Sequence, residues 1–107
     1  MDKTIEPVNF NASKDLVNHL DEMFDQLTTY HDRIVKADIY LKSLQVQNRD
    51  ENKQVQIRIF LPGEDLFMEQ TAESFVSAAQ KLYDRAKRHL SKINRRDKDK
   101  ARQAAGA

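Results

Sequence analysis

The sequence contains no cysteine, and its 107 residues include only two glycines and two prolines. Without cysteine, disulfide scaffolds, thiolate zinc sites, iron–sulfur clusters and thiol catalysis are excluded, and the cytoplasm is the expected compartment. No apolar run is longer than four residues, so no segment is expected to span a membrane. The start of the chain has an acid at position 2 and no apolar stretch, so we expect no secretory signal there. Few glycines and prolines indicate regular elements joined by few tight turns.

The net charge of +1 hides a strong asymmetry along the chain. Lysine and arginine total 18, and aspartate and glutamate total 17. Residues 81–102 hold ten basic and three acidic side chains, a net of +7, whereas residues 1–80 hold eight basic and fourteen acidic ones, a net of −6. A local excess of this size indicates a polyanionic partner for the C-terminal part.

Hydrophobic periodicity predicts six elements in the order β-α-β-β-β-α. The predicted strands cover residues 4–11, 34–42, 54–61 and 65–71, and the predicted helices run from about residue 14 to 28 and from 75 to 94. Ser13 and Ser74 are expected to cap the helices, and Pro62-Gly63 to form a tight turn. A polar hairpin loop is expected at 47–52, and in the second strand Val35 is expected on the same face as Ala37.

This order predicts an α+β fold, a two-layer sandwich with a four-stranded sheet and both helices on one face. The first connection is a crossover, so the first two strands should be parallel if they are neighbours. The layout is similar to a double-stranded-RNA-binding domain at the level of fold. We expect a single domain over residues 1–96. The charged segment 97–107, which has no large apolar residue, is expected to be a disordered tail or a fraying helix end.

A helical spacing of about 100° per residue places six cations of the second helix in one stripe opposite its apolar face. The stripe consists of Lys81, Arg85, Arg88, Lys92, Arg95 and Arg96. Because only Asp84 is nearby within the helix, we expect the field of these cations to be uncompensated. Phosphate backbones are the commonest target of such a field, and an ordinary solvated helix face is the alternative.

Four segments of the chain resemble a short ribosome hibernation-promoting factor, of the RaiA-like family of ribosome-associated translation inhibitors. They are Tyr30–Ile34, Ala37–Lys42, Leu61–Phe67 and Lys87–Lys92. The resemblance covers roughly residues 5–96, and the β-α-β-β-β-α order of the family agrees with the order predicted from periodicity.

The resemblance implies binding to the 30S ribosomal subunit, in the cleft where messenger RNA and the anticodon ends of transfer RNA lie. Family members contact 16S rRNA through basic residues on their helices and hold ribosomes idle under starvation or in stationary phase. By position, Arg33, Arg85, Arg88 and Lys92 match basic residues of the family. Lys81, Arg95 and Arg96 extend the set only through the helical stripe. The first helix departs from the family because its outer face is acidic and carries only Lys14.

Other residue types give weaker hypotheses. Tyr40 and Phe60, on the expected open face of the sheet, are candidates for stacking on bases. The three histidines, His19, His31 and His89, have neither the spacing nor the cysteine partners of a metal site, and we expect His31 to be structural or solvated. With no phosphate loop or nucleophile motif, we expect no catalytic residue, no cofactor, no metal and no small-molecule substrate.

Two functions therefore remain open, neither of them enzymatic. The first is a monomeric cytoplasmic protein that occupies the small subunit and blocks translation in response to stress. The second is a small non-ribosomal RNA-binding or protein-interaction module, with the acidic first helix as its recognition face. The sequence leaves open whether bound ribosomes form dimers.

Overall fold

The structure is a computed structural model that describes residues 1–45 and 51–106, with side chains described through residue 101. Its elements follow the predicted order, with one 3₁₀ turn added after the first helix. They are β1 (Asp2–Val8), α1 (Lys14–Asp25), η1 (Gln26–Thr29), β2 (Lys36–Ser43), β3 (Lys53–Leu61), β4 (Glu64–Ala72) and α2 (Phe75–Gly106). No helix in these ranges is both long and apolar enough to cross a bilayer.

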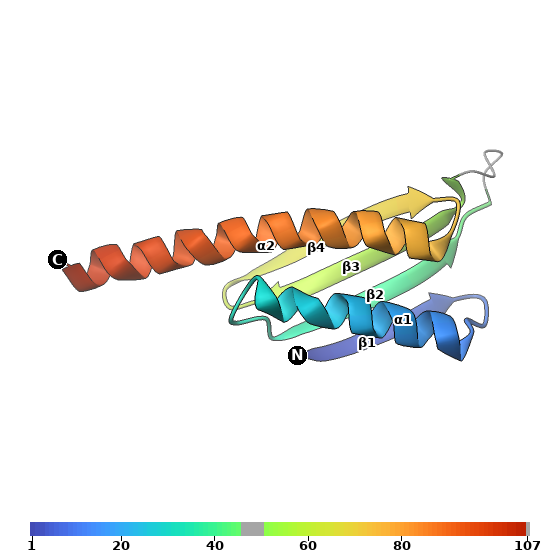
Figure 1. Ribbon diagram of the computed structural model, residues 1–107, viewed down its shortest axis with the longest axis horizontal. Coiled ribbons are helices and arrows are strands. Elements are labelled where there is room, and N and C mark those ends of the chain that lie inside the picture. The colour runs from blue at the N-terminus through green and yellow to red at the C-terminus, as the bar shows by residue number, and fades with distance from the viewer. Residues whose placement is uncertain (46–50, 107) are drawn as a thin grey trace.

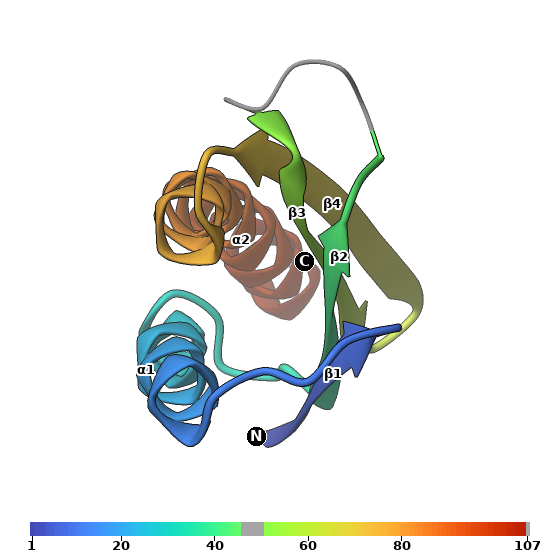
Figure 2. The ribbon, with the colours of Figure 1, turned by 90° about the vertical axis from the view of Figure 1, so that its right-hand side faces the viewer.

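The four strands form one sheet in the order β1-β2-β3-β4. β1 pairs with β2 in parallel, and the other two pairs are antiparallel. The parallel pair arises because α1 carries the chain back along the sheet before β2 begins. Both helices lie on one face, α1 beside β1 and α2 beside β3 and β4 (Figure 2). The predicted α+β sandwich with one open face is confirmed.

The core lies between the sheet and the two helices and is built from alternating strand residues and one stripe of each helix. Its fully buried members include Leu20, Phe24, Leu27, Ala37, Ile39, Leu41, Val55, Ile57, Ile59, Ala79, Leu82, Ala86 and Leu90. Full burial of one large aliphatic or aromatic side chain contributes about 1.5–3 kcal/mol, so this layer supplies the main stabilisation. The apolar face predicted for the second helix is confirmed at Ala79, Leu82, Ala86 and Leu90, but Val76 at its start is exposed.

The predicted helix caps and the predicted turn are present. The backbone N–H of Leu16 donates to Ser13 Oγ at 3.1 Å, and that of Ser77 donates to Ser74 Oγ at 3.1 Å. Each serine thereby satisfies one of the free N–H groups in the first turn of its helix. Gly63 has φ +82°, the left-handed conformation that the turn between β3 and β4 requires.

Two predicted boundaries and one predicted strand face in the first 36 residues are wrong. The first strand covers Asp2–Val8 rather than 4–11, since Asn9 adopts a left-handed φ of 63° that ends the extended chain. α1 ends at Asp25, and η1 completes the segment that was predicted to be α-helical. Val35 is 58% exposed and precedes β2, whereas Ile34 packs on the core. Val35 lies before the regular alternation of β2 begins at Lys36. Ile34, one residue earlier, is therefore the side chain that reaches the core.

The second helix is longer than predicted. It continues past Asn94 to Gly106, so residues 97–106 follow the helix-end alternative. These residues are rich in lysine, arginine, glutamine and alanine, which have high helix propensity, and no glycine or proline interrupts them before Gly106. A helix already nucleated on the core propagates through such residues without a buried face. The C-terminal part of α2 therefore projects beyond the sheet (Figure 1).

Part of the predicted hairpin loop, residues 47–50, lies outside the described residues. Next to it, the Leu44 N–H donates to the carbonyl oxygen of Asn52 at 2.7 Å and joins the ends of β2 and β3. The pairing of these two strands agrees with a hairpin connection.

Candidate nucleic-acid interface

The six predicted stripe residues all lie exposed on α2, on the side turned away from its buried face. From Lys81 to Arg96 the stripe extends about 22 Å at the rise of an α-helix. Within the described residues, no carboxylate oxygen lies within 4.0 Å of the cationic groups of five of the six. These five are Lys81, Arg85, Arg88, Lys92 and Arg95. Their charge remains available to an anion.

Part of the stripe forms one wall of a hollow between α2 and β4. The hollow has a volume of about 260 Å³ and is lined by Met68, Arg85, Arg88, His89 and Lys92. Met68, which is buried, is the apolar member of the lining, and the other four lining residues belong to α2. The arrangement offers several N–H donors to one small anionic group, such as a phosphate.

Arg85 differs from its neighbours because β4 holds it in place. Its Nη1 atom donates to the carbonyl oxygen of Glu69 at 2.8 Å and to Gln70 Oε1 at 3.0 Å. Both acceptors are uncharged, so Arg85 keeps its positive charge while losing much of its side-chain freedom. A cation fixed in this way meets an anion with a smaller entropic cost than a free one.

The prediction of an uncompensated stripe is wrong at its C-terminal end. Arg96 forms an ion pair with Glu64 at the start of β4 and a second one with Asp97 at 3.3 Å. The hydrogen bonds that Arg96 donates to these two carboxylates raise its pKa above the usual value, and the bond to Glu64 has the larger effect. Asp97 also lies 3.7 Å from Arg33 Nη2. Two of the seven predicted rRNA-binding residues are therefore already paired.

The predicted structural role of His31 agrees with its environment. Only 1% of the residue is exposed. Its Nδ1 atom accepts the Arg33 N–H at 3.0 Å, which places the proton of a neutral ring on Nε2. Nε2 lies 3.9 Å from Asp97 Oδ2. His31 thus lies buried between the loop before β2 and Asp97 of α2, and within the described residues Nε2 has no hydrogen-bond partner.

Tyr40 and Phe60 lie half-buried on the open face of the sheet. Lys36 Nζ lies 4.5 Å from the centroid of the Phe60 ring, so a cation already covers this aromatic ring. Sequence reasoning missed Phe67, which is 55% exposed on the same face opposite Arg58. Its outward place in the alternation of β4 was the available signal. Stacking by Tyr40 and Phe60 stays a prediction.

The electrostatics of the open face differ from those of the α2 stripe. The outward strand positions carry five acids and three bases, a net charge of −2. They are Asp2, Glu6, Asp38, Asp65 and Glu69 with Lys36, Lys42 and Arg58. A polyanion is therefore drawn to α2 rather than to the sheet.

An aromatic cluster holds the base of α2 against α1. The Tyr83 ring packs edge-on against Phe24 and Tyr30, each with a centroid distance of 6.4 Å. Burial and the hydroxyl of Tyr30 raise the pKa of Tyr83 from 10.0 to about 12.

We expect one tyrosine to ionise near pH 12 in an ultraviolet titration, and Tyr83→Phe to remove that transition. The pKa of Tyr83 is higher in the folded chain than in the unfolded one, so neutral Tyr83 contributes to the free energy of unfolding. This contribution is complete below pH 10 and is lost as the pH rises to about 12. A titration in which all tyrosines ionise near pH 10 contradicts this.

These features define an α+β sandwich that presents a cationic helix beside an edge strand. Residues 4–98 match the family described as Sigma 54 modulation protein / S30EA ribosomal protein, and the chain belongs to that family. The predicted relation to ribosome hibernation-promoting factors is confirmed, and the family is one of ribosome-associated proteins. No curated protein matches the chain.

Two solved structures share the fold. The N-terminal domain of Protein Y from Thermus thermophilus has a TM-score of 0.72 at 17% identity, covering 87% of this chain and 99% of that one. A ribosomal subunit interface protein from Coxiella burnetii has a TM-score of 0.70 at 18% identity, covering 87% and 97%. At these identities the likeness establishes the architecture.

Proposed function

We propose that this protein binds the 30S ribosomal subunit through 16S rRNA in the decoding cleft and blocks messenger and transfer RNA binding during stress or stationary phase. The observation that carries the proposal is the hollow beside β4, where Arg88 and Lys92 have no carboxylate partner among the described residues. Membership of the S30EA family and the fold shared with a ribosomal subunit interface protein support the ribosome as the target.

The proposed mechanism is occupancy rather than catalysis. Arginine and lysine bind phosphate oxygens and fix the position of the protein, with little reading of base sequence. Folded RNA is recognised mainly through shape and backbone, which suits a rigid sandwich with a basic helix at one side. With 32 residues, α2 is about 48 Å long, long enough to lie along several successive phosphates. A bound protein of this size excludes other ligands of the same cleft sterically.

A competition experiment tests this proposal. Purified 30S subunits loaded with fluorescent messenger RNA and initiator transfer RNA are mixed with the protein in the cytoplasmic salt range. We expect release of both labels, and cosedimentation that weakens steeply as salt rises, because phosphate contacts release counterions. Cosedimentation without release of either label contradicts occlusion of the cleft. Binding of free RNA without cosedimentation favours the non-ribosomal RNA-binding alternative.

The carboxylates around Arg96 give a second prediction. In the double variant Glu64→Gln/Asp97→Asn, Arg33 and Arg96 lose their intramolecular partners and become available to phosphates. We expect the affinity for 30S subunits to rise about two- to fivefold, the size of one or two exposed ion pairs. Cosedimentation with graded protein concentrations measures it, and Asp65→Asn, which removes one carboxylate on the open sheet face, serves as a control. Unchanged affinity in the double variant argues that neither arginine contacts rRNA.

A further inference from the structure

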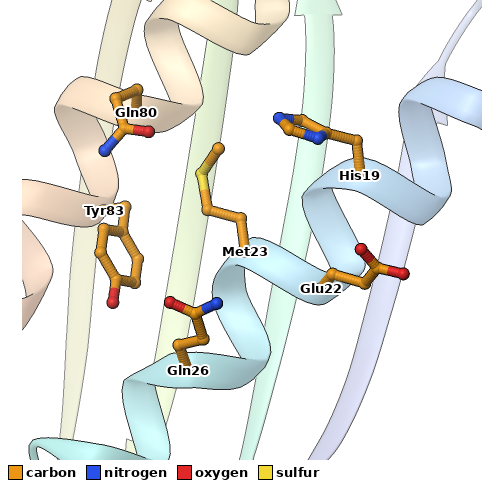
Figure 3. A pocket seen from close by; sticks show the side chains of 6 residues that line it. All are labelled: His19, Glu22, Met23, Gln26, Gln80 and Tyr83. Carbon is orange, nitrogen blue, oxygen red and sulfur yellow. The ribbon is translucent and has the colours of Figure 1, made fainter.

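A groove lies between the outer sides of α1 and α2, away from the basic stripe. It has a volume of about 280 Å³ and is lined by His19, Glu22, Met23, Gln26, Gln80 and Tyr83. Figure 3 shows Met23 standing between the two helices, with Gln80 and Tyr83 facing it from α2. The groove thus combines an apolar floor, formed by a thioether and an aromatic ring, with amide groups on its walls.

Carboxylates flank this groove on both sides. Glu22 lies on the outer flank of α1 (Figure 3), and Asp84 of α2 accepts a hydrogen bond from Gln80 Nε2 at 3.3 Å. Within the described residues, no cation lies within 4.0 Å of either carboxylate, or of Asp15, which lies about two turns before Glu22 on α1. The groove therefore has a negative rim on its α1 side, at Glu22 and Asp15, whereas Asp84 on the α2 side lies one turn from Lys81 and Arg88 of the basic stripe.

The other two acids of α1 are already engaged and do not contribute in the same way. Lys3 Nζ lies 2.7 Å from Asp25 and 3.4 Å from Asp21, and its hydrogen bond holds the pKa of Asp25 below its usual value. The free negative charge is thereby concentrated on the side of α1 that borders the groove.

We propose that this groove binds a lysine- or arginine-rich segment of another protein. The aliphatic stem of such a side chain fits against Met23 and Tyr83, while its charged head reaches Glu22 or Asp84. The amide oxygens of Gln26 and Gln80 accept its N–H groups. Charge complementarity selects this partner, since the same carboxylates repel RNA.

The groove and the basic stripe occupy different sides of α2. At about 100° per residue, Gln80 lies roughly 80° around the helix from Arg88 and roughly 120° from Lys92, whereas Asp84 lies only about 40° from Arg88. The protein can thus hold a polyanion on one side and a basic protein segment on the other. This second surface stands independently of the proposed ribosomal function.

A peptide-binding experiment on the full chain tests the groove. The probe is a fluorescein-labelled nona-arginine peptide, and the measurement is fluorescence anisotropy at low salt. Gln80→Lys places a cation on the groove wall at an exposed position, and we expect it to weaken binding about tenfold. Glu22→Gln should weaken it about threefold, the size of one exposed ion pair. The matched control, Gln45→Lys, makes the same change at an exposed residue outside the groove and should change binding less than about twofold.

Each outcome decides the proposal. A selective loss in Gln80→Lys and Glu22→Gln supports the groove as the site. Equal losses in Gln80→Lys and Gln45→Lys mean that the peptide follows net charge, which overturns it, and so does an absence of peptide binding in the wild type. Concentration-dependent dimers that Gln80→Lys abolishes, measured by light scattering, also overturn it, because the occupant is then a second copy of the chain.

Discussion

Charge reversal in the hollow beside β4, in the double variant Arg88→Glu/Lys92→Glu, should weaken binding to 30S subunits by about a hundredfold or more. Each of the two side chains supplies a charge-assisted contact of about 1.5–3 kcal/mol, and the new carboxylates repel the phosphates that the wild type attracts. Both residues are exposed and no carboxylate pairs with them among the described residues, so the fold should not change. Cosedimentation with purified subunits gives the affinity, and circular dichroism verifies the fold.

The matched control for this variant is Lys14→Glu/Lys36→Glu. It makes the same change in net charge at two exposed positions, one at the start of α1 and one on β2, both outside the hollow. We expect an affinity loss of less than about fivefold, from long-range attraction alone. Equal losses in the two double variants mean that overall charge, and not the hollow, determines binding, and that result refutes the proposed interface.

Salt dependence separates the two roles of the stripe residues. The slope of log affinity against log salt reports how many phosphates a protein neutralises, at roughly 0.7–0.9 per contact. Arg88→Glu/Lys92→Glu should therefore lower the slope by about two contacts. Arg85 has the additional task of joining α2 to β4 through Glu69 and Gln70. For that reason it is left unchanged in the test variant.

The fold was largely predictable because alternation and helical periodicity recur wherever a residue meets the core. Ile57 and Ile59 repeat every second position, Leu82 and Ala86 follow the helical period, and Ser13 and Ser74 mark where the helices begin. The element ends were less predictable. Asn9 ends β1 because its backbone is left-handed, and the residues next to it in the sequence do not predict that conformation. α2 passes Asn94 because high helix propensity continues after the last buried residue.

The candidate interface was predictable only in part. A helical projection places Arg88 and Lys92 on one exposed side, and the structure agrees. It cannot place Glu64 beside Arg96, since the two residues are 32 positions apart and meet only when β4 folds against α2. Electrostatic compensation between elements is a tertiary property, which is why a stripe that looks uniform in sequence divides into free and paired cations.

Replacement of Phe24 with alanine should have the largest effect on stability, a loss of about 3–5 kcal/mol. Phe24 is fully buried at the centre of the core, and its ring packs edge-on against Tyr83, which in turn packs against Tyr30. The substitution leaves a cavity between α1, α2 and the sheet and removes an aromatic pair worth about 0.5–1.5 kcal/mol beyond its buried area. Since small domains are stable by about 5–15 kcal/mol, a substantial unfolded fraction is expected at moderate temperature.

Urea denaturation followed by circular dichroism measures this loss, and Phe67→Ala provides the matched control. The control makes the same chemical change at a ring that is 55% exposed on the open face, so we expect a loss of less than about 0.5 kcal/mol. The contrast depends only on burial, because both residues are phenylalanines in regular elements. If Phe24→Ala and Phe67→Ala have the same midpoint, the core does not lie between the helices and the sheet. If Phe24→Ala alone unfolds early, the packing that holds α2 and its cations in place depends on this ring.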